Sequence, residues 1–489
     1  MSRSSLTVHA DGVADFGEQR VVTLRVFKSH IHRLGALALL DACIIVLAVH
    51  AAIQLRFTGF SVPPLAFETS LGPLWPKAPL MAGVFVLSIA ALGLYQLRQR
   101  ARFAGTCVRL AIAFCVAHAM LALIFYLAPS LYVGRGVMVL TSGFAFIGLA
   151  LAHYVFLRLV DEEVFKRRVL VWGAGKRAAS IGTRLRRRAD QRGFNIIGFV
   201  PAPGDAGTEV PAERLVTPNR GLCAFALRLK VEEIVVAADD RRSGFPAAEL
   251  LECRLRGIQV SDIASFLELE SGRVSVELTH PSWLIFSDGF NCNFLRLASK
   301  RLLDVVLSVV ILILTMPLAL LTAAAIYLED RGPVFYRQIR TGQNGRPFWI
   351  LKFRSMRPDA ERNGLAVWAQ QKDPRVTRVG ALIRRLRIDE LPQLLNVLAG
   401  QMSLVGPRPE RPIFVEELAQ AVPYYPQRHF VKPGITGWAQ VRYSYTASQV
   451  DAQHKLEYDL FYVKHHSFAF DLMVLLQTVE IVLFRIGAR

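Results

Sequence analysis

Apolar residues are concentrated in four long runs within the first third of the chain, at residues 34–55, 79–97, 107–127 and 137–157. Each run is close to the roughly 20 residues that a helix needs to cross about 30 Å of hydrocarbon. The polar stretch before the first run has no small-residue cleavage site, so we expect an anchor rather than a removed signal peptide. The pattern predicts a cytoplasmic tail over residues 1–33 and a four-helix transmembrane bundle over residues 34–160.

Basic residues are unevenly distributed around these runs. They cluster before the first run, after the second and after the fourth: Arg20, Arg25, Lys28, Arg33, Arg98, Arg100, Arg102, Arg158, Lys166, Arg167 and Arg168. The other two connections carry only Arg56, Lys77 and Arg135. The excess of positive charge on cytoplasmic loops predicts that both ends of the bundle face the cytoplasm. Asp41 and His50 inside the first run indicate either a polar pathway or polar contacts within the bundle.

A stretch with alternating strand and helix patterns follows over residues 166–285. RRVLVWGAG, a basic helix over 176–191, NIIGFV and EEIVVAA predict a Rossmann-like α/β domain with a parallel sheet. Gly173, Gly175 and Ala178 occupy the small-residue slots of a dinucleotide fingerprint. The acid that would bind a ribose is missing, since the first acid after the second strand is Asp205. The pattern predicts the fold and leaves nucleotide binding open.

A fifth apolar run lies at residues 305–327, with Pro317 near its centre. Basic residues flank it on both sides, with Lys300 and Arg301 before it and Arg331 and Arg337 after it. Both ends are therefore expected in the cytoplasm, and proline bends or breaks a helix. We predict a re-entrant membrane hairpin over residues 296–330 that turns at residues 315–317. The alternative, a kinked helix that crosses the membrane, would put the remaining 160 or so residues outside the cell.

The final stretch, residues 331–489, is predicted to form a small α/β catalytic domain. In FWILKFRSM (348–356) the residues alternate as in a strand, so Lys352 and Arg354 are expected on one face. Two cations at this spacing suit a diphosphate, although a solvated basic strand face would look the same.

An acid pair stands out in RLRIDELPQLLNVLAG (385–400). Because proline is tolerated only in a first turn, we expect a helix that begins near Asp389 and ends at Gly400. Asp389 and Glu390 would then lie at a helix N-terminus among the basic residues Arg384, Arg385 and Arg387. One carboxylate can attack phosphorus while the other holds Mg²⁺ or moves protons. A lone Asp in this position would simply be a helix cap.

Two further motifs lie downstream. GPRPE (406–410) places Arg408 between Pro407 and Pro409, which restricts its backbone to extended geometry and holds the guanidinium at low entropic cost. KPGITGWAQV (432–441) is a turn followed by Trp438, which either lines a site or covers a core.

These motifs carry a resemblance that covers residues 296 to 489. The pairs Lys300-Arg301 and Asp389-Glu390, the mid-run Pro317, and the motifs KFRSM, LPQL, GPRP and KPGITGWAQV resemble the bacterial sugar transferase family. These are monotopic phosphoglycosyl transferases, which make polyprenyl-diphosphate-sugars. The bundle and middle domain resemble the large members of the family, which load undecaprenyl phosphate with glucose phosphate to initiate exopolysaccharide synthesis.

The resemblance implies a ping-pong reaction. Asp389 would attack the sugar-bearing phosphorus of a UDP-sugar, release UMP and pass the phosphosugar to undecaprenyl phosphate. Glu390 would engage Mg²⁺. The other positions implied are substrate-binding residues (Lys352, Arg354, Arg387, Pro407, Arg408 and Pro409) and membrane-hairpin residues (Lys300, Arg301, Asp304 and Pro317).

Composition and charge set the expected surroundings. The chain has 489 residues, 53% of them hydrophobic, and a net charge of +19. We expect a multi-pass protein of the bacterial inner membrane with its catalytic domain on the cytoplasmic face, in contact with lipid and not with nucleic acid. UDP-glucose is the expected sugar donor, and homo-oligomer formation stays open.

Two other functions compete with this one. A membrane-anchored nucleotide-sugar dehydratase or epimerase would need a Tyr-x-x-x-Lys pair, which the sequence lacks. A non-catalytic membrane scaffold is expected to have lost the acid pair and Arg408, which are all present.

Overall fold

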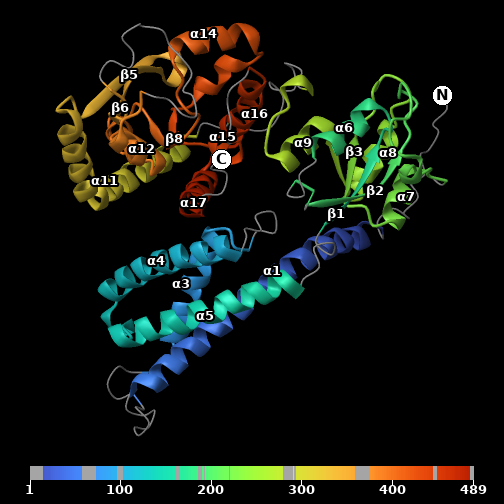
Figure 1. Ribbon diagram of the computed structural model, residues 1–489. Helices are drawn as coiled ribbons and strands as arrows, with labels where there is room; N and C mark the ends of the chain where they lie inside the picture. Colours follow the sequence, from blue (N-terminus) through green and yellow to red (C-terminus); the bar gives the residue numbers. More distant parts are fainter. Residues whose placement is uncertain are drawn as a thin grey trace, which may run out of the picture. The chain divides into compact units, whose positions relative to one another are not determined.

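The computed structural model describes residues 15–57, 73–95, 103–159, 166–185, 190–191, 193–219, 221–278, 290, 293–357, 375–443 and 449–484. The chain divides into two compact units, Met1–Ser271 and Gly272–Arg489. The first contains a helical bundle and a sheet domain, and the second is a mixed α/β domain with one very long helix (Figure 1).

The bundle consists of α1 (Asp15–Phe57), α3 (Lys77–Ala91), α4 (Phe103–Leu127) and α5 (Arg135–Leu159). Its interior is mainly apolar, with Ile45, Phe85, Leu110 and Leu149 fully buried. Segments of α1, α4 and α5 are long and apolar enough to cross a membrane. Helix α1 begins at Asp15 because no proline interrupts the sequence from there to the first apolar run, so the helix includes much of the predicted tail.

The second predicted span is shorter than the sequence suggested. Helix α3 has 15 residues, or about 22 Å, which is less than the hydrocarbon thickness. Gly93 adopts φ = +73°, and its N–H and that of Leu94 donate to Ala90 O and Ile89 O at 2.9 and 3.3 Å. This Schellman motif ends the helix before the apolar run ends.

Asp41 of α1 is fully buried inside the bundle. Its Oδ2 accepts hydrogen bonds from Tyr95 Oη at 2.7 Å and His153 Nε2 at 3.0 Å. Because His153 lies on α5, this hydrogen bond joins two helices. It agrees with the hypothesis that Asp41 makes polar contacts within the bundle. His50 lies on the exposed side, with its Nδ1 2.8 Å from Val46 O of its own helix.

The sheet domain has four parallel strands in the order β2-β1-β3-β4. They are β1 (Arg167–Trp172), β2 (Phe194–Val200), β3 (Glu233–Val236) and β4 (Gln259–Asp262), and the helices are α6 (Lys176–Arg184), α7 (Leu222–Arg228), α8 (Ala247–Leu255) and α9 (Ile263–Ser271). Leu170, Val171, Ile234 and Val235 are fully buried, as the continuous apolar strands predicted. The segment after α9 packs into the second unit, where Val274 N–H donates to Glu457 O at 3.0 Å.

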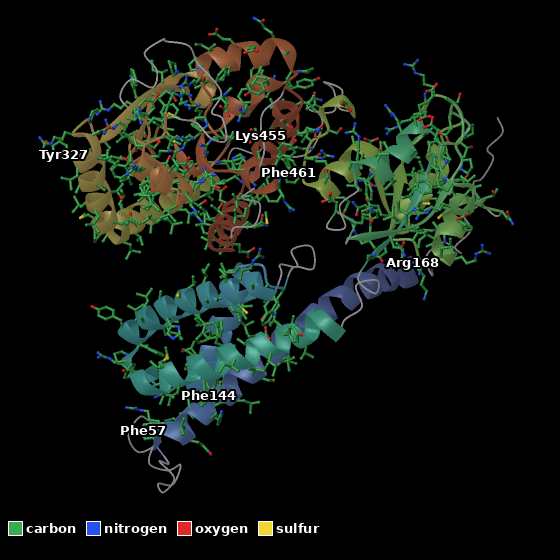
Figure 2. The ribbon with its side chains drawn as sticks, viewed as in Figure 1. Phe57, Phe144, Arg168, Tyr327, Lys455 and Phe461 are labelled. Carbon is green, nitrogen blue, oxygen red and sulfur yellow. The ribbon has the colours of Figure 1, made fainter. Side chains whose placement is uncertain are left out.

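The long apolar run of the second unit forms α11 (Phe294–Asp330). The predicted break at residues 315–317 is absent, because the chain stays helical and bends instead (Figure 1). Pro317 removes one backbone donor and crowds the preceding turn, which bends a helix without ending it. Only about a tenth of the most apolar window is buried, and Tyr327 lies on the outer side of the helix (Figure 2).

Both ends of α11 are fixed to the same domain. Near the start, Lys300 Nζ donates to Asp471 Oδ2 at 2.7 Å, Arg301 donates to two backbone carbonyls, and Asp304 Oδ1 accepts from Leu404 N at 3.0 Å. Near the end, Ile326 packs on Phe353. The predicted hairpin residues Lys300, Arg301 and Asp304 therefore anchor the helix to the domain that follows it.

That domain begins with an antiparallel hairpin of β5 (Phe335–Thr341) and β6 (Pro347–Phe353). The later elements are α12 (Arg378–Arg385), α13 (Gln393–Leu398), β7 (Ser403–Val405), α14 (Pro412–Ala421), β8 (Gly434–Thr436), α15 (Trp438–Arg442), α16 (Gln449–His465) and α17 (Phe468–Phe484), with β7 and β8 parallel. Trp438 is buried against Phe461 and Phe470, so it covers a core rather than lining a site.

Candidate functional site

The inner face of the β5–β6 hairpin is polar. Exposure alternates along β5, so Tyr336, Gln338 and Arg340 share one face, and Tyr336 pairs with Lys352 of β6. Arg354 follows on the same face, as the alternation in the sequence predicted. All five residues line a cavity of about 470 Å³.

The acid pair lies on a tight turn, from which Asp389 lines this cavity. Arg387 adopts φ = +60° and ends the preceding helix, and Ile388–Glu390 forms a single 3₁₀ turn. The prediction of a helix beginning near Asp389 was wrong, since α13 begins only at Gln393, after Pro392. The left-handed residue before the turn directs both acids inward, and both are buried.

Glu390 is held by three cations. Its Oε1 accepts a hydrogen bond from Arg408 Nη2 at 2.9 Å and lies 3.6 Å from both Lys352 Nζ and Arg387 Nη1. Burial alone would raise the pKa of Glu390, but the attraction of Arg408, Lys352 and Arg387 outweighs it and lowers the pKa to about 2. Glu390 is therefore ionised at neutral pH, and its charge holds the basic side chains around it.

Asp389 differs from its neighbour in both contacts and charge. It lines the cavity, and its buried Oδ1 has no hydrogen-bond partner among the residues that the structure describes. Burial raises the pKa of Asp389, and the nearby charge of Glu390 raises it further. A more basic carboxylate with one free oxygen is suited to attack an electrophile in the cavity.

Arg408 is held through the backbone of its own loop. Its carbonyl accepts from Arg428 Nη2 at 3.1 Å, and the carbonyl of Pro409 accepts from Arg340 Nη1 at 3.2 Å. Arg428 is itself buried and paired with Asp459 at 2.7 Å. The prolines make this loop stiff and the two arginines fix it, so the guanidinium of Arg408 is preorganised before any ligand arrives.

The two cations predicted to act together on β6 have different partners. Lys352 faces Glu390, and its pKa is lowered to about 8 by burial and by the repulsion of Arg408. Arg354 pairs with Asp330 at the end of α11, and its buried Nε and Nη1 have no hydrogen-bond partner among the described residues. Lys352 thus belongs with the acids, whereas Arg354 pairs with Asp330 and keeps two buried nitrogens without a partner in the described structure.

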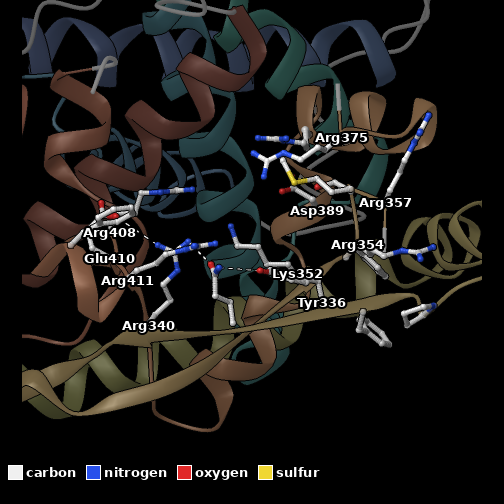
Figure 3. A pocket seen from close by; sticks show the side chains of 18 of the residues that line it. Tyr336, Arg340, Lys352, Arg354, Arg357, Arg375, Asp389, Arg408, Glu410 and Arg411 are labelled. Atoms are coloured by element: carbon white, nitrogen blue, oxygen red, sulfur yellow. Dashed lines mark hydrogen bonds and ion pairs between the residues drawn. The ribbon is translucent and has the colours of Figure 1, made fainter. Parts of the chain in front are cut away.

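Basic residues gather in two groups around the acids (Figure 3). Arg340, Arg408 and Arg411 lie on one side together with Glu410, whereas Arg354, Arg357 and Arg375 lie on the other side with Asp389, and Lys352 lies between the groups. Lys455 of α16 also lines the cavity, although it is distant in sequence. Sequence reasoning missed Arg340, Glu410, Arg428 and Lys455. Arg340 carried a signal in the alternation along β5, and Glu410 closes the GPRPE motif, whereas Arg428 and Lys455 carried none.

In the glycine-rich turn of the sheet domain, unlike in the cavity, the potential phosphate donors already have partners. The backbone N–H groups of Lys176 and Arg177 at the start of α6 donate to the carboxylate of Asp239 at 3.0 and 2.9 Å, and Ala174 N–H donates to Asp205 at 2.8 Å. These are the donors that a nucleotide phosphate would use in a dinucleotide-binding turn. Here two carboxylates of the chain itself occupy them.

Asp389 and Glu390 provide only a few carboxylate oxygens that could bind a metal ion. No group of three or more His, Cys, Asp or Glu side chains forms a metal site among the described residues. Asp389 has a buried oxygen without a partner, and the three basic contacts to Glu390 all reach its Oε1. This donor set fits Mg²⁺, which needs only one or two carboxylates when substrate phosphates and water supply the other ligands.

In a comparison with known proteins, the family match lies within the second unit. The bacterial sugar transferase family matches residues 295–485, which include α11 and the cavity. An undecaprenyl-phosphate glucose phosphotransferase of Komagataeibacter xylinus is 33% identical over 377 residues, covering 76% of this chain and 68% of the relative.

Two further relatives match shorter regions. A UDP-N-acetylgalactosamine-undecaprenyl-phosphate N-acetylgalactosaminephosphotransferase of Aeromonas hydrophila is 42% identical over 251 residues, which is 51% of this chain and 58% of the relative. A UDP-glucose:undecaprenyl-phosphate glucose-1-phosphate transferase of Escherichia coli is 43% identical over 182 residues, which is 37% and 39% of the two chains. The matched regions and the cavity lead to one conclusion: the chain belongs to the bacterial sugar transferase family.

Proposed function

We propose that the protein transfers a sugar-1-phosphate from a UDP-sugar to undecaprenyl phosphate and thereby starts the synthesis of an exopolysaccharide or capsule. The observation that carries this proposal is Asp389, a buried carboxylate that lines a basic cavity and whose Oδ1 has no hydrogen-bond partner among the described residues. Such a carboxylate suits covalent catalysis on a phosphate ester, and the relatives named above transfer sugar phosphates to undecaprenyl phosphate by their names.

The proposed chemistry has two steps that share one carboxylate. An Asp389 oxygen attacks the sugar-bearing phosphorus of the UDP-sugar, the bond to the bridging oxygen breaks, and UMP leaves with the electron pair. A phosphate oxygen of undecaprenyl phosphate then attacks the same phosphorus, and the bond to Asp389 breaks and restores the carboxylate. Both nucleophiles are anions, so neither step needs a proton to be removed.

The basic residues have distinct tasks in this proposal. Arg408, preorganised by its loop, stabilises the charge that develops on the phosphates, and Lys352 and Arg387 act beside it. Glu390 keeps these cations in position and, together with substrate phosphates, would hold Mg²⁺. When bound, the metal ion would neutralise charge on the diphosphate.

The surroundings are also part of the proposal. We propose that α11 enters one leaflet and returns to the same side, because both of its ends are fixed to one domain and its middle exposes apolar side chains. The catalytic domain would then lie on the cytoplasmic face of the bacterial inner membrane, with the acids near the headgroups. We propose glucose as the sugar, since the glucose phosphotransferase covers 76% of this chain, and N-acetylgalactosamine as its rival.

The decisive experiment measures UMP release from a panel of UDP-sugars by the full chain in detergent, with and without undecaprenyl phosphate. We expect Asp389→Asn to lower UMP release by at least about 10³-fold. Because burial raises the pKa of Asp389, its ionised form is disfavoured in the folded protein, and the neutral variant should unfold at an equal or higher temperature at neutral pH.

Glu417→Gln is the matched control, since it removes the same charge from an exposed position on α14 of the same domain. It should leave UMP release unchanged. Mass spectrometry of the wild type with UDP-sugar alone should find a phosphosugar on Asp389. Normal UMP release by Asp389→Asn would contradict the proposal, as would an adduct on another residue.

A further inference from the structure

The cavity has two chemically different ends. One end, which we call the α11 end, is lined by Pro333, Phe335, Phe353 and Met356 together with Arg354, Arg357 and Arg375. The other, which we call the loop end, is lined by the charged residues Arg340, Arg408, Glu410, Arg411 and Lys455. The α11 end thus combines four apolar residues with its basic groups, on the opposite side of Lys352 from the Arg408 loop (Figure 3), whereas Phe414, three residues after Arg411, also lines the cavity.

The α11 end adjoins the most apolar helix of the domain. Phe353 packs against Ile326 in the last turns of α11, and Arg354 N–H donates to Val334 O at 2.9 Å, just after the helix ends. Leu320, Leu321 and Leu328 on the same part of α11 are at least 66% exposed. A molecule held by a membrane around this helix would therefore reach the α11 end of the cavity first.

The mouth at this end is aromatic. The rings of Phe335 and Phe353 are stacked, with centroids 5.4 Å apart and an interplanar angle of 16°. Phe353 is buried, whereas Phe335 is 49% exposed although it borders a basic cavity. Exposed aromatic surface beside cations indicates a ligand that is partly apolar and partly anionic.

Arg354 provides the second, independent observation. Its side chain is only 6% exposed, lines the cavity, and has two buried nitrogens without a hydrogen-bond partner among the described residues. A buried guanidinium rarely leaves two donors unused, and a phosphate oxygen would satisfy them. Gly332 lies directly against this guanidinium, where a larger residue would displace it.

We propose that the α11 end is the acceptor subsite, where Phe335 contacts the first isoprene units of the lipid and Arg354 binds its phosphate, while the nucleotide occupies the loop end. This inference rests on the proposed function. It assigns the two substrates to opposite ends of one cavity, with Asp389 on the side of the acceptor subsite, so the diphosphate of the nucleotide reaches Asp389 past Lys352. The incoming phosphate oxygen forms a bond to the phosphorus as the bond to Asp389 breaks.

The test separates the two half-reactions. Exchange of labelled UMP into UDP-sugar without acceptor reports the first step, and product formation with undecaprenyl phosphate reports both. We expect Phe335→Ala to raise the KM for undecaprenyl phosphate about tenfold and to leave UMP exchange within twofold of the wild type. A soluble phosphate with two isoprene units should show the same rise in KM, because the contact is with the first units.

Trp349→Ala is the matched control. Trp349 is 57% exposed and belongs to the same hairpin but does not line the cavity, so its loss tests general effects of removing an exposed aromatic. It should leave both KM values unchanged. As a measurement independent of turnover, undecaprenyl phosphate should raise the melting temperature of the wild type and of Trp349→Ala more than that of Phe335→Ala.

The outcomes distinguish the two proposals. An unchanged KM in Phe335→Ala, or an equal loss in exchange and transfer, would overturn the acceptor subsite while leaving the reaction in place. Absence of UMP exchange in the wild type with every UDP-sugar would instead overturn the proposed function. A rise in KM for the long acceptor only would also contradict the inference, because it would move the contact to the distal chain.

Discussion

Within the described part of the chain, the start of α6 and the cavity of the second unit both offer donors that could receive a phosphate, and they differ in whether those donors are already used. At the start of α6, the backbone N–H groups of Lys176 and Arg177 are bonded to Asp239. In the catalytic cavity, Arg354 has two buried nitrogens and Asp389 one buried oxygen without partners among the described residues.

Hydrogen-bond satisfaction therefore distinguishes a structural turn from a reactive site. Buried polar groups are nearly always satisfied, so a satisfied turn indicates stability, while unsatisfied groups in a cavity indicate a missing ligand. The glycine-rich turn looks like a nucleotide site in the sequence, but its anion is an internal carboxylate. The acid pair could have been a helix cap, but Asp389 is bonded to no helix N-terminus in the described structure.

The largest effect is expected at the preorganised loop that carries Arg408. We expect Arg408→Ala to lower UMP release by about 10²-fold, because a fixed donor to the developing charge is lost. Arg428→Lys should lower it by roughly tenfold, because the carbonyl of Arg408 loses its donor and the loop shifts. UMP release by the full chain, with separate kcat and KM values, measures both.

The double variant decides whether Arg428 acts through Arg408. If it does, Arg428→Lys will cause little further loss in the Arg408→Ala background, whereas a merely destabilising change will add its full effect. Additive losses would show that the buried pair of Arg428 and Asp459 supports the domain in general. The melting temperature of each variant provides the necessary comparison.

The sequence predicted the elements whose periodicity is strong. The parallel strands with Val171 and Val235, the strand that carries Lys352, and the apolar helices follow from alternation or from continuous apolar runs. Local backbone geometry was harder to foresee. The left-handed Arg387 ends α12 and is followed by a 3₁₀ turn that contains Asp389, so α13 begins only at Gln393. Gly93 shortens α3, because a single positive φ value decides where a helix ends.

The site was only partly predictable for a related reason. Asp389, Glu390 and Arg408 lie in compact motifs, so the sequence shows them together. Arg428 and Lys455 reach the same region from η9 (Tyr425–Phe430) and α16, and their spacing from the motifs carries no periodic signal. Which donors remain unused, as at Arg354, depends on three-dimensional packing and cannot be read from residue types.

A smaller effect should appear in the pH dependence. The pKa of Lys352 is lowered to about 8 by burial and by Arg408, so the ammonium group loses its proton as the pH rises through about 8. If this charge assists phosphate transfer, kcat for UMP release should fall about tenfold from pH 7 to pH 9. Lys352→Arg should keep its charge and remove this alkaline limb.

The raised pKa of Asp389 gives the opposite limb, since activity should fall as the pH drops and the carboxylate is protonated. This acid limb should persist in Lys352→Arg, which makes it an internal control. If the alkaline loss of activity persisted in Lys352→Arg, a group other than Lys352 would be responsible for it. Rates should be measured at constant ionic strength, because phosphate binding by cations depends on salt.

The smallest effect is expected in the satisfied turn. Asp239→Asn removes the charge that bonds two N–H groups at the start of α6, and should lower the free energy of unfolding by about 1 kcal/mol. UMP release should not change. Asp240→Asn is the matched control, because the neighbouring Asp240 is exposed and accepts only a local hydrogen bond from Arg242 N–H.

Thermal unfolding of the full chain in detergent, with and without NAD or a UDP-sugar, tests whether the turn at the start of α6 binds a nucleotide. Because Asp239 and Asp205 occupy the donors of the turn, no nucleotide should stabilise the sheet domain. Asp239→Asn should not create such stabilisation, since its single amide oxygen still accepts from one of the two N–H groups and Asp205 still accepts from Ala174 N–H. If NAD stabilised the full chain and this stabilisation disappeared when Asp239 was changed, the turn would have to open for a ligand. The closed turn would then be one state of a working site.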